Sequence, residues 1–367
     1  MSYNWQQKNW PNFLYKLDNE DDLLAFNEQV WQVSGMLKAM PEDSKEEFIL
    51  NTMVAEAIKT SAIEGEDLNR QDVISSIRNN LGLNMKPERI KDKKAQGAGA
   101  LMIAVRNTYA EPLTEKTLFA WHTMLLESNT RIAFGAWRKH KEPMQVISGA
   151  VGRERIHFEA PSSQKVPEEM RRFIKWFNDT APGGKKEIKK APVRSAIAHL
   201  YFESIHPFED GNGRIGRAIA EKALSQTIGR PILLSLSQTI EANKKAYYSA
   251  LEEAQSSEDV SNWVRYFVHT VLQAQLQAGN LIGFTLKKVK FFDRYKSKLN
   301  ERQLKAINRM MEAWPQNFEG GMTTKKYIAI TKTSKATATR DLQELVEIGI
   351  LNSVGSGRSV HYNLVLL

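Results

Sequence analysis

Residues 206–217 read HPFEDGNGRIGR, and this stretch decides how the rest of the chain is interpreted. It places one histidine, two carboxylates, three glycines and two arginines within twelve consecutive positions. Such a concentration of ionisable and conformationally free residues indicates a chemical site rather than a simple connection between helices.

The histidine of this stretch is expected at the end of a helix. Pro207 disfavours helical backbone at the residue before it, so the helix through Val193, Ile197 and Leu200 should end near His206. An imidazole that faces a loop can keep one ring nitrogen free to accept a proton near neutral pH. We therefore predict that His206 is a general base.

The glycines of the stretch predict an anion site. Gly211, Asn212 and Gly213 can adopt positive φ, and they open a helix whose first N–H groups have no partner of their own. Backbone donors that converge at a helix N-terminus bind anions, phosphate above all.

Charged side chains surround that anion site. Arg214 and Arg217 are three residues apart and project from one face of the helix, where they repel each other unless an anion joins them. Asp210 is a hard oxygen ligand at the position where a phosphate-bound Mg²⁺ would sit. Together, the base, the anion site, the metal ligand and the paired guanidiniums indicate nucleotidyl or phosphoryl transfer.

Bulk composition limits the possible settings of this chemistry. The 367 residues suffice for two or three domains, and the net charge of +9 suits an acidic partner such as a nucleotide or nucleic acid. There is no cysteine, which excludes disulfides and thiolate chemistry. The N-terminus lacks a signal-peptide pattern and no run is apolar enough to span a membrane, so we expect a cytoplasmic protein without a membrane partner.

The rest of the chain is predicted to be mainly α-helical. Apolar spacing indicates helices in the first 63 residues and around 69–80, 88–108, 114–128, 166–179, 192–205 and 212–228. Residues 143–158 alternate between apolar and polar side chains on both sides of SGAVGRER, which predicts a small β-hairpin. The other histidines show no metal-ligand spacing, and we interpret them as structural or surface residues.

The C-terminal part has the order of a winged helix-turn-helix domain. Three predicted helices precede two short strands, with Ser334 as an N-cap, Gly349 as a helix stop and GSGR as a hairpin tip. Its second and third helices, the turn between them and the wing tip offer side chains that could meet DNA bases or phosphates, although such modules also dock proteins or form dimers. These side chains are Lys325, Lys326, Lys332, Lys335, Thr337, Thr339, Arg340 and Arg358.

HPFEDGNGRIGR resembles the signature HxFx(D/E)GNGRxxR of Fic-domain proteins and matches every fixed position of it. The hairpin at 143–158 is similar to the family's target-docking flap, and GAWR at 135–138 is similar to the segment that leads into that flap. The resemblance covers most of the chain, because helical N-terminus, Fic core and winged helix occur together in one bacterial subgroup. It implies a Fic-type helical bundle with a β-hairpin flap.

The resemblance also implies a function, which is transfer of AMP from ATP to a Tyr, Thr or Ser hydroxyl of a target protein. His206 would deprotonate the hydroxyl, Asp210 would hold Mg²⁺, and residues 211–213 with Asn212 would form the anion hole. Arg214 would bind the phosphates and Arg217 the γ-phosphate. Gly213 favours AMP transfer, because members that transfer phosphate carry lysine there.

Further residues take roles only by this resemblance. Ile215 and Gly216 complete the ATP-binding stretch, and Asn243, Tyr247 and Tyr248 are candidates for contact with adenine, with packing as the alternative for the tyrosines. Ile156, His157 and Phe158 of the flap would pair with an extended segment of the target.

Residues 60–65, TSAIEG, resemble the family's inhibitory motif (S/T)xxxE(G/N). Thr60 supplies the hydroxyl, Glu64 the carboxylate and Gly65 the helix stop. A carboxylate paired with Arg217 would occupy the guanidinium that the γ-phosphate needs. This predicts an enzyme inhibited by its own N-terminal region.

The sequence thus predicts four regions, namely 1–110 with the inhibitory motif, 111–270 as the Fic catalytic domain, 271–299 as a helical connector and 300–367 as the winged helix. Expected partners are ATP and a protein with a surface hydroxyl, with DNA and a second copy of the chain as further possibilities. Two alternatives stay open, which are a DNA-binding regulator that senses nucleotide through the Fic site, and removal of AMP from modified proteins.

Overall fold

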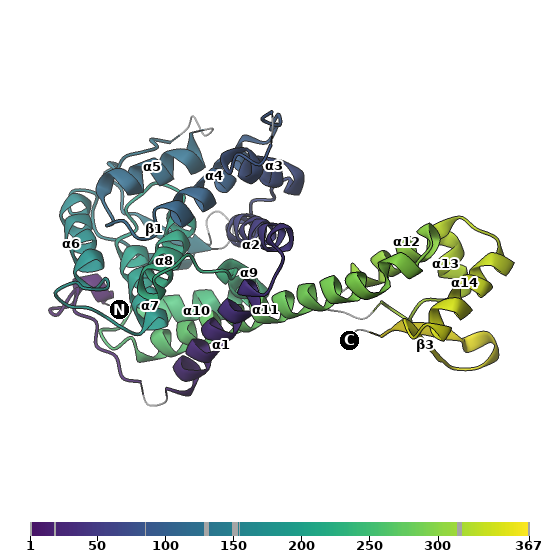
Figure 1. Cartoon of the computed structure of the whole chain (residues 1–367). Coiled ribbons are helices and arrows are strands. Elements are labelled where there is room, and N and C mark those ends of the chain that lie inside the picture. The colour runs from purple at the N-terminus through teal and green to yellow at the C-terminus, as the bar shows by residue number, and fades with distance from the viewer. Residues whose placement is uncertain are drawn as a thin grey trace. The chain divides into compact units, whose positions relative to one another are not determined.

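The computed structural model describes residues 2–17, 20–84, 86–127, 132–148, 153, 155–313 and 318–365. In this part of the chain there are fourteen α-helices and two antiparallel two-stranded hairpins (Figure 1). The mainly α class predicted from the sequence is confirmed. None of the helices described is both long enough and apolar enough to cross a bilayer.

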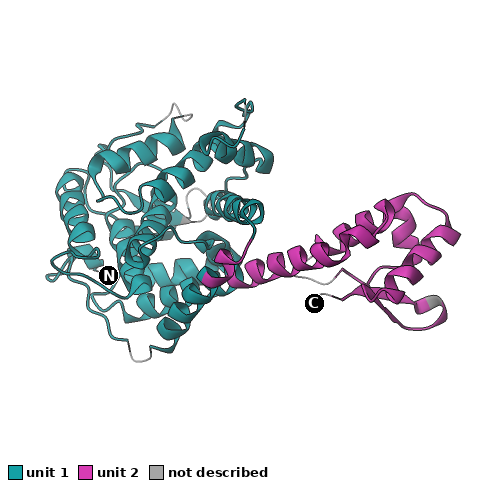
Figure 2. Cartoon of the chain, viewed as in Figure 1, with its two compact units in different colours: residues 1–34, 41–278 teal, residues 35–40, 279–367 magenta. Residues whose placement is uncertain are grey.

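The chain divides into two compact units (Figure 2). Unit 1 comprises residues 1–34 and 41–278, and unit 2 comprises residues 35–40 and 279–367. Each unit has hydrophobic clusters of its own residues. The four regions expected from the sequence remain a prediction, and helix α11 runs unbroken through residue 270.

The first unit contains the elements up to the first part of α11, except for residues 35–38 at the end of α1. They are η1 (Asn4–Gln6), α1 (Asp21–Lys38), α2 (Glu42–Ile63), α3 (Arg70–Asn80), α4 (Lys93–Asn107), α5 (Glu115–Leu126), β1 (Gln145–Ser148), β2 (Arg155–Glu159), α6 (Val166–Asp179), α7 (Ala191–Ile205), α8 (Asn212–Ile228), α9 (Leu236–Ala242), α10 (Lys244–Ala254) and α11 (Ser261–Tyr295).

Side-chain caps set several of these helix ends. Asp92 accepts hydrogen bonds from the backbone N–H groups of Lys94 and Ala95, so α4 begins at Lys93 and not at 88 as the apolar spacing suggested. Thr114 caps α5 through the N–H of Thr117. Local polar chemistry therefore corrects boundaries that periodicity alone leaves loose.

Helix α7 forms the centre of unit 1. All of its residues from Ala191 to Ile205 are buried, and α8 packs along it with most of its own residues buried. An all-round buried helix is held rigidly by neighbours on every side. The HPFEDGNGRIGR loop joins these two helices, so its ends are fixed by the most buried part of the fold.

The β-hairpin lies between α5 and α6 in the chain. Val146 pairs with Phe158, and Ile147 pairs with Ile156 after an irregularity in the register. The predicted hairpin is thus present, while residues 149–152 and 154 at its turn lie outside the described residues.

Unit 2 follows the order that the sequence predicts for its C-terminal part. After the end of α11 come η2 (Lys296–Lys298), α12 (Glu301–Met311), α13 (Thr324–Thr331), α14 (Lys335–Glu347), β3 (Leu351–Val354), η3 (Gly357–Ser359) and β4 (His361–Leu364). Ser334 caps α14, and Gly349 adopts a φ of +77° just after it. Phe291 and Tyr295 of α11 pack into the core of this unit.

Candidate active site

His206 ends helix α7 in a strained backbone conformation. It is the C-cap residue, with φ +50° and ψ +60°, and it shares positive φ with only one other non-glycine residue in the described chain, Lys332. A non-glycine residue rarely adopts this conformation, and the surrounding structure has to impose it. The imidazole is thereby presented at the loop, where the sequence predicted a base.

Arg138, the last residue of GAWR, imposes much of this conformation. Its guanidinium donates to the carbonyl oxygens of His206 at 2.8 Å and of Pro161, and its backbone N–H donates to the Pro207 carbonyl at 3.0 Å. The side chain is buried, and burial lowers its pKa to about 10. Arg138 therefore satisfies carbonyl groups at the C-terminal end of α7 with hydrogen bonds and holds the backbone of His206 in place.

His122 holds the other side of the same loop. Its Nδ1 accepts from the Gly135 N–H at 2.9 Å, so its Nε2 donates to the Asp210 carbonyl at 3.1 Å, and its ring stacks on Phe208. Burial lowers the pKa of His122 and keeps it neutral. The interpretation of this histidine as structural agrees with these contacts.

The glycine-rich turn opens α8 as expected. Gly211 is the N-cap residue at φ +79°, and the helix begins at Asn212. The side-chain amide of Asn212 accepts from the backbone N–H of Phe208 and donates to its carbonyl, each at 2.9 Å. Asn212 thus closes the loop with its side chain, which leaves its backbone N–H to serve an anion.

A carboxylate of the N-terminal region occupies this helix N-terminus. Helix α2 ends at Ile63, Gly65 takes φ +80°, and Glu64 Oε1 accepts from Arg217 Nη2 at 2.7 Å. The same carboxylate oxygen lies where a Cβ on Gly213 would collide with it. The structure therefore brings Glu64, Gly213 and Arg217 together at the predicted anion site.

Arg217 is held by hydrogen bonds to Thr60 of α2 and to Glu64 just after that helix. Its Nε donates to the Thr60 hydroxyl at 2.8 Å, and Nη2 donates to the Thr60 carbonyl at 2.9 Å. The guanidinium is fully buried, which by itself lowers its pKa, but the charge and hydrogen bond of Glu64 together with the nearby Tyr247 and Glu203 outweigh burial and raise it. Arg217 therefore stays charged and already has an anionic partner from its own chain.

A second carboxylate, which sequence reasoning missed, meets the other arginine of the motif. Glu66 Oε2 lies 2.6 Å from Arg214 Nη1, and Glu66 Oε1 lies 2.8 Å from Lys94 Nζ. Arg214 is almost fully buried, with 4% of its side chain exposed. In the sequence, Glu64 and Glu66 stand two residues apart and offer one carboxylate for each arginine. This spacing is the pattern from which the second contact could have been predicted.

Three further residues of the predicted ATP site, Ile215, Gly216 and Asn243, contact other parts of unit 1. Ile215 is fully buried in the core, and Gly216 lies against Glu203 and His199 of α7. The Asn243 side chain caps α10 through the Ala246 N–H at 3.3 Å.

The two tyrosines differ in accessibility. Tyr247 is buried and its hydroxyl lies 2.8 Å from His199 Nε2, which favours the packing alternative for this residue. Tyr248 is 37% exposed. Burial and the charge of Glu64 raise the pKa of its hydroxyl, and the charge of Arg217 acts in the opposite direction. Of the pair, only Tyr248 presents a surface that a base could contact.

Asp210, the predicted metal ligand, has a partly exposed carboxylate. Half of its side chain is exposed, and its Oδ1 lies 3.5 Å from Arg214 Nη2. No group of three or more acidic, histidine or cysteine side chains that could hold a metal occurs in the described part of the chain. One exposed carboxylate fits Mg²⁺ that arrives with a nucleotide, because this ion takes its remaining ligands from phosphates and water.

The three predicted flap residues do not share one environment. Ile156 is 49% exposed and pairs with the equally exposed Ile147, whereas Phe158 is buried with its ring against Tyr3. His157 Nδ1 lies 2.9 Å from Glu252 Oε2 of α10. Phe158 and His157 therefore attach the hairpin to the body of the unit, and the isoleucines face outward.

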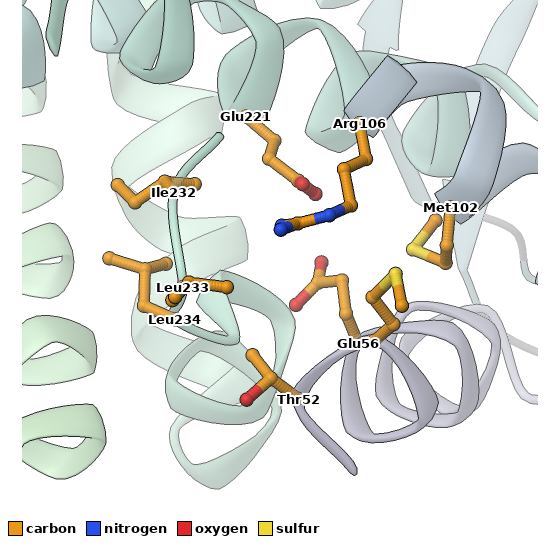
Figure 3. Close-up of a pocket in the computed structure, with 9 residues that line it drawn as sticks. Thr52, Glu56, Met102, Arg106, Glu221, Ile232, Leu233 and Leu234 are labelled. Atoms are coloured by element: carbon orange, nitrogen blue, oxygen red, sulfur yellow. The ribbon is translucent and has the colours of Figure 1, made fainter. Parts of the chain in front are cut away.

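A separate small cavity lies between α2, α4, α8 and the loop before α9. It is lined by Thr52, Met53, Glu56, Met102, Arg106, Glu221, Ile232, Leu233 and Leu234. Figure 3 shows the Arg106 side chain between the carboxyl groups of Glu56 and Glu221. This cluster contains none of the residues predicted for the active site.

Comparison with known proteins is consistent with this geometry. Residues 112–224 match the Fic/DOC family, and residues 3–83 match a domain of unknown function, DUF4172. The chain is 29% identical over 145 residues to a probable protein adenylyltransferase of Aquifex aeolicus (strain VF5), covering 40% of this chain and 38% of that protein. It is 28% identical over 143 residues to a protein adenylyltransferase of Caenorhabditis elegans, covering 39% of this chain and 25% of the relative.

Solved structures agree on the fold. A Fic family protein from Desulfovibrio desulfuricans G20 aligns with a TM-score of 0.53 at 18% identity, over 96% of this chain and 98% of the other. A Fic-domain signaling protein from Bacteroides thetaiotaomicron VPI-5482 aligns with a TM-score of 0.53 at 17% identity, over 71% and 97% of the two chains.

The curated relatives match this chain over less than half of their own length.

Proposed function

We propose that this chain, which carries a Fic/DOC-family domain over residues 112–224, transfers AMP from ATP to a hydroxyl side chain of a target protein, itself included, and is held inactive by Glu64. The observation that carries the proposal is the 2.7 Å contact between Glu64 and Arg217 at the N-terminus of α8. Because a carboxylate is bound at this helix N-terminus, the position is suited to anions, and a phosphate group could bind there in place of Glu64.

The proposed reaction uses the residues around this site. The target's hydroxyl oxygen attacks the α-phosphorus of ATP, the bond from that phosphorus to the bridging oxygen breaks, and pyrophosphate leaves. His206 takes the proton of the hydroxyl as general base. The N–H groups of residues 211–213 and the guanidinium of Arg214 would stabilise charge on the phosphates.

Mg²⁺ is proposed as the accompanying metal ion. The exposed carboxylate of Asp210 would hold it next to the phosphates of ATP, in keeping with an ion that takes one or two protein carboxylates and completes its shell with phosphate and water. Bound there, Mg²⁺ would neutralise part of the phosphate charge.

The target would dock on the hairpin. Ile147 and Ile156 expose an apolar pair on β1 and β2, and an extended segment of a target can add to such an edge through main-chain hydrogen bonds. Pairing of this kind demands little of the target's sequence. The hydroxyl of the paired segment would then be presented to His206.

Inhibition would follow from competition for Arg217. While Glu64 holds this guanidinium, the γ-phosphate lacks its partner, so ATP binds in a pose unsuited to in-line attack. Thr60 contributes by fixing the orientation of Arg217.

The deciding experiment compares the wild type, Glu64→Gly and His206→Ala/Glu64→Gly with α-labelled ATP and Mg²⁺, alone and with cell lysate. Glu64→Gly should incorporate at least about tenfold more label than the wild type, because a charge-assisted bond of roughly 1.5–3 kcal/mol no longer opposes productive binding. His206→Ala should abolish that label. Asp67→Asn, which neutralises a neighbouring exposed carboxylate, is the matched control and should behave as the wild type.

Equal incorporation by the wild type and Glu64→Gly would reject the inhibition, and no label in any variant would reject AMP transfer. The same proteins incubated with an already modified target test AMP removal, in which Glu64 would orient a water molecule. In that case wild type, and not Glu64→Gly, would release free AMP.

Unit 2 supports a second candidate, a nucleotide-sensing regulator that binds DNA. Lys335 and Arg340 are exposed on α14, the helix that a winged helix-turn-helix would insert into the major groove. The Arg358 side chain lies outside what the structure describes. Salt-dependent binding of duplex DNA by the full chain, lost in Lys335→Glu/Arg340→Glu, would favour this candidate over a docking role for unit 2.

A further inference from the structure

Three ionisable side chains form a row on one face of α7. His199, Glu203 and the C-cap His206 follow each other at spacings of four and three residues, which places them on the same side of the helix. Glu203 is the middle member, and its side chain is only 5% exposed. A carboxylate this buried requires partners, and the reaction proposed above assigns it no role.

Glu203 lies next to the predicted base. Its Oε2 is 3.6 Å from Nδ1 of His206. Nδ1 of His206 and Oε1 of Glu203 are both buried, and neither has a hydrogen-bond partner among the described residues. The two groups are thus a donor and an acceptor for which a small rotation of the imidazole closes a hydrogen bond, a tightening that is common when a site engages its substrate.

Helix α8 leaves room for this carboxylate. A Cβ on Gly216 would collide with Glu203 Oε1 and would lie 3.1 Å from His199 Nδ1. Gly216, which stands at a variable position of the signature, therefore allows α8 to approach Glu203, and a side chain there would displace the carboxylate.

The charged surroundings favour the ionised form of Glu203. Burial raises the pKa of this carboxyl, but His206, His199 and Arg217 together outweigh burial and bring the pKa below its ordinary value. Tyr247 of α10 also faces the carboxylate, and its own pKa is raised by burial and by Glu203, so it remains a neutral phenol. Glu64 lies near the same group of residues on the α2 side.

We propose that Glu203 is the positioning residue of the base, and that it holds the proton of His206 on Nδ1 so that Nε2 is free to take the hydroxyl proton. The inference rests on the proposed function, because it assigns a role in the same proton transfer. It explains why a buried carboxylate stands three residues before the histidine.

The chemistry follows the logic of a carboxylate–imidazole pair. An imidazole has two tautomers, and a carboxylate that accepts from Nδ1–H selects the one whose Nε2 lone pair points to the opposite side. When Nε2 takes the proton from the target hydroxyl, His206 becomes an imidazolium, and the negative charge of Glu203 stabilises it. The proton of Nδ1 stays where it is.

A spectroscopic test does not depend on turnover. The ¹⁵N chemical shifts of the histidine rings are recorded for the wild type, Glu203→Gln and Ser204→Ala, with the His206 signals assigned by their loss in His206→Ala. Wild type and Ser204→Ala should show His206 as the Nδ1–H tautomer at alkaline pH, and Glu203→Gln should show a mixture. Ser204 is the matched control, because it is equally buried in the same turn but accepts from Asn4 at 2.8 Å.

A kinetic test uses the Glu64→Gly background. Adding Glu203→Gln should lower kcat for AMP transfer at least about tenfold and shift the acid limb of the pH–rate profile about one unit to lower pH, with KM for ATP unchanged. The acid limb shifts downward because the imidazolium of His206 loses the nearby anion that stabilises it.

An unchanged tautomer and an unmoved acid limb in Glu203→Gln would overturn the inference, even if kcat fell, because that pattern indicates a merely structural role. If Glu64→Gly itself transferred no AMP, the proposed function would fail, whereas the tautomer measurement would still decide the role of Glu203.

Discussion

At the scale of single residues, each arginine of the motif is paired with a carboxylate from the segment after α2. Arg217 contacts Glu64 and Arg214 contacts Glu66. Two positively charged side chains one helical turn apart would repel, and the two carboxylates remove that repulsion. A nucleotide that uses both arginines for its phosphates has to displace both carboxylates.

This arrangement predicts that Glu66 adds to the inhibition. Glu66→Gln in the Glu64→Gly background should lower the apparent KM for ATP about three- to tenfold, because the buried Arg214 loses its half-buried, charge-assisted partner and becomes free for phosphate. Initial rates at varied ATP measure it. Lys94→Met is the control, since it removes the other partner of Glu66 but leaves the contact with Arg214. A KM for Glu66→Gln equal to that of the control would contradict the prediction.

At the scale of elements, α2, α4 and α8 are joined by the cluster around the cavity of Figure 3. Glu56 accepts hydrogen bonds from the hydroxyl of Ser235 and the N–H of Ser237, so its charge is well satisfied. For Glu221, burial and the charge of Glu56 raise the pKa to about 8, with Arg106 acting in the opposite direction. Glu221 therefore retains its proton near neutral pH in the folded protein.

A pH dependence of stability follows. Between about pH 4.5 and 8 the folded state holds a proton on Glu221 that the unfolded chain has lost, so the free energy of unfolding should fall as pH rises through this range. Glu221→Gln, which is neutral at every pH, should remove part of this slope and be more stable than wild type at pH 8 by about 1–3 kcal/mol. Urea unfolding at pH 5, 7 and 8 measures the difference. Parallel pH profiles for both proteins would disprove the prediction.

Helix α14 of unit 2 is fixed by a buried carboxylate. Asp341 accepts from Arg302 Nε at 2.8 Å and from the Tyr327 hydroxyl at 2.9 Å, and thereby links α14 to α12 and α13. Burial raises the pKa of this carboxyl, but its bonds to Arg302 and Tyr327 outweigh burial and lower it. Helix α14, which carries the exposed Lys335 and Arg340, thus has a defined orientation within unit 2.

At the scale of the whole molecule, the two units have hydrophobic clusters with no residue in common among the described residues. All of the predicted active-site residues belong to unit 1, whereas Asp341 belongs to unit 2. A chain with separate cores is expected to depart from two-state unfolding.

Calorimetry of the full chain should therefore show two thermal transitions. Asp341→Ala should lower the Tm of one transition by several degrees, because it leaves the Tyr327 hydroxyl and the Arg302 guanidinium without their buried partner. ATP with Mg²⁺ should raise the Tm of the other transition in Glu64→Gly, since ligand binding stabilises the unit that holds the site. A single transition that responds to both changes would refute this expectation.

The amino-acid sequence by itself determined the mainly helical class, the order of elements in unit 2 and the local chemistry of residues 206–217. These features depend on spacing and on residue type, which act over a few positions. Helix caps such as Ser334 and the helix stop at Gly65 were readable for the same reason.

Only the tertiary structure decided which distant groups meet that local chemistry. Glu203 precedes His206 by three residues, but its role depended on the position of α8, where Gly216 makes room for the carboxylate. The contact of Arg138 with the backbone of His206 joins residues 68 positions apart, and that of Glu66 with Arg214 joins residues 148 apart. Such pairings are set by the packing of whole helices against one another, and no pattern within a single segment of sequence contains that information.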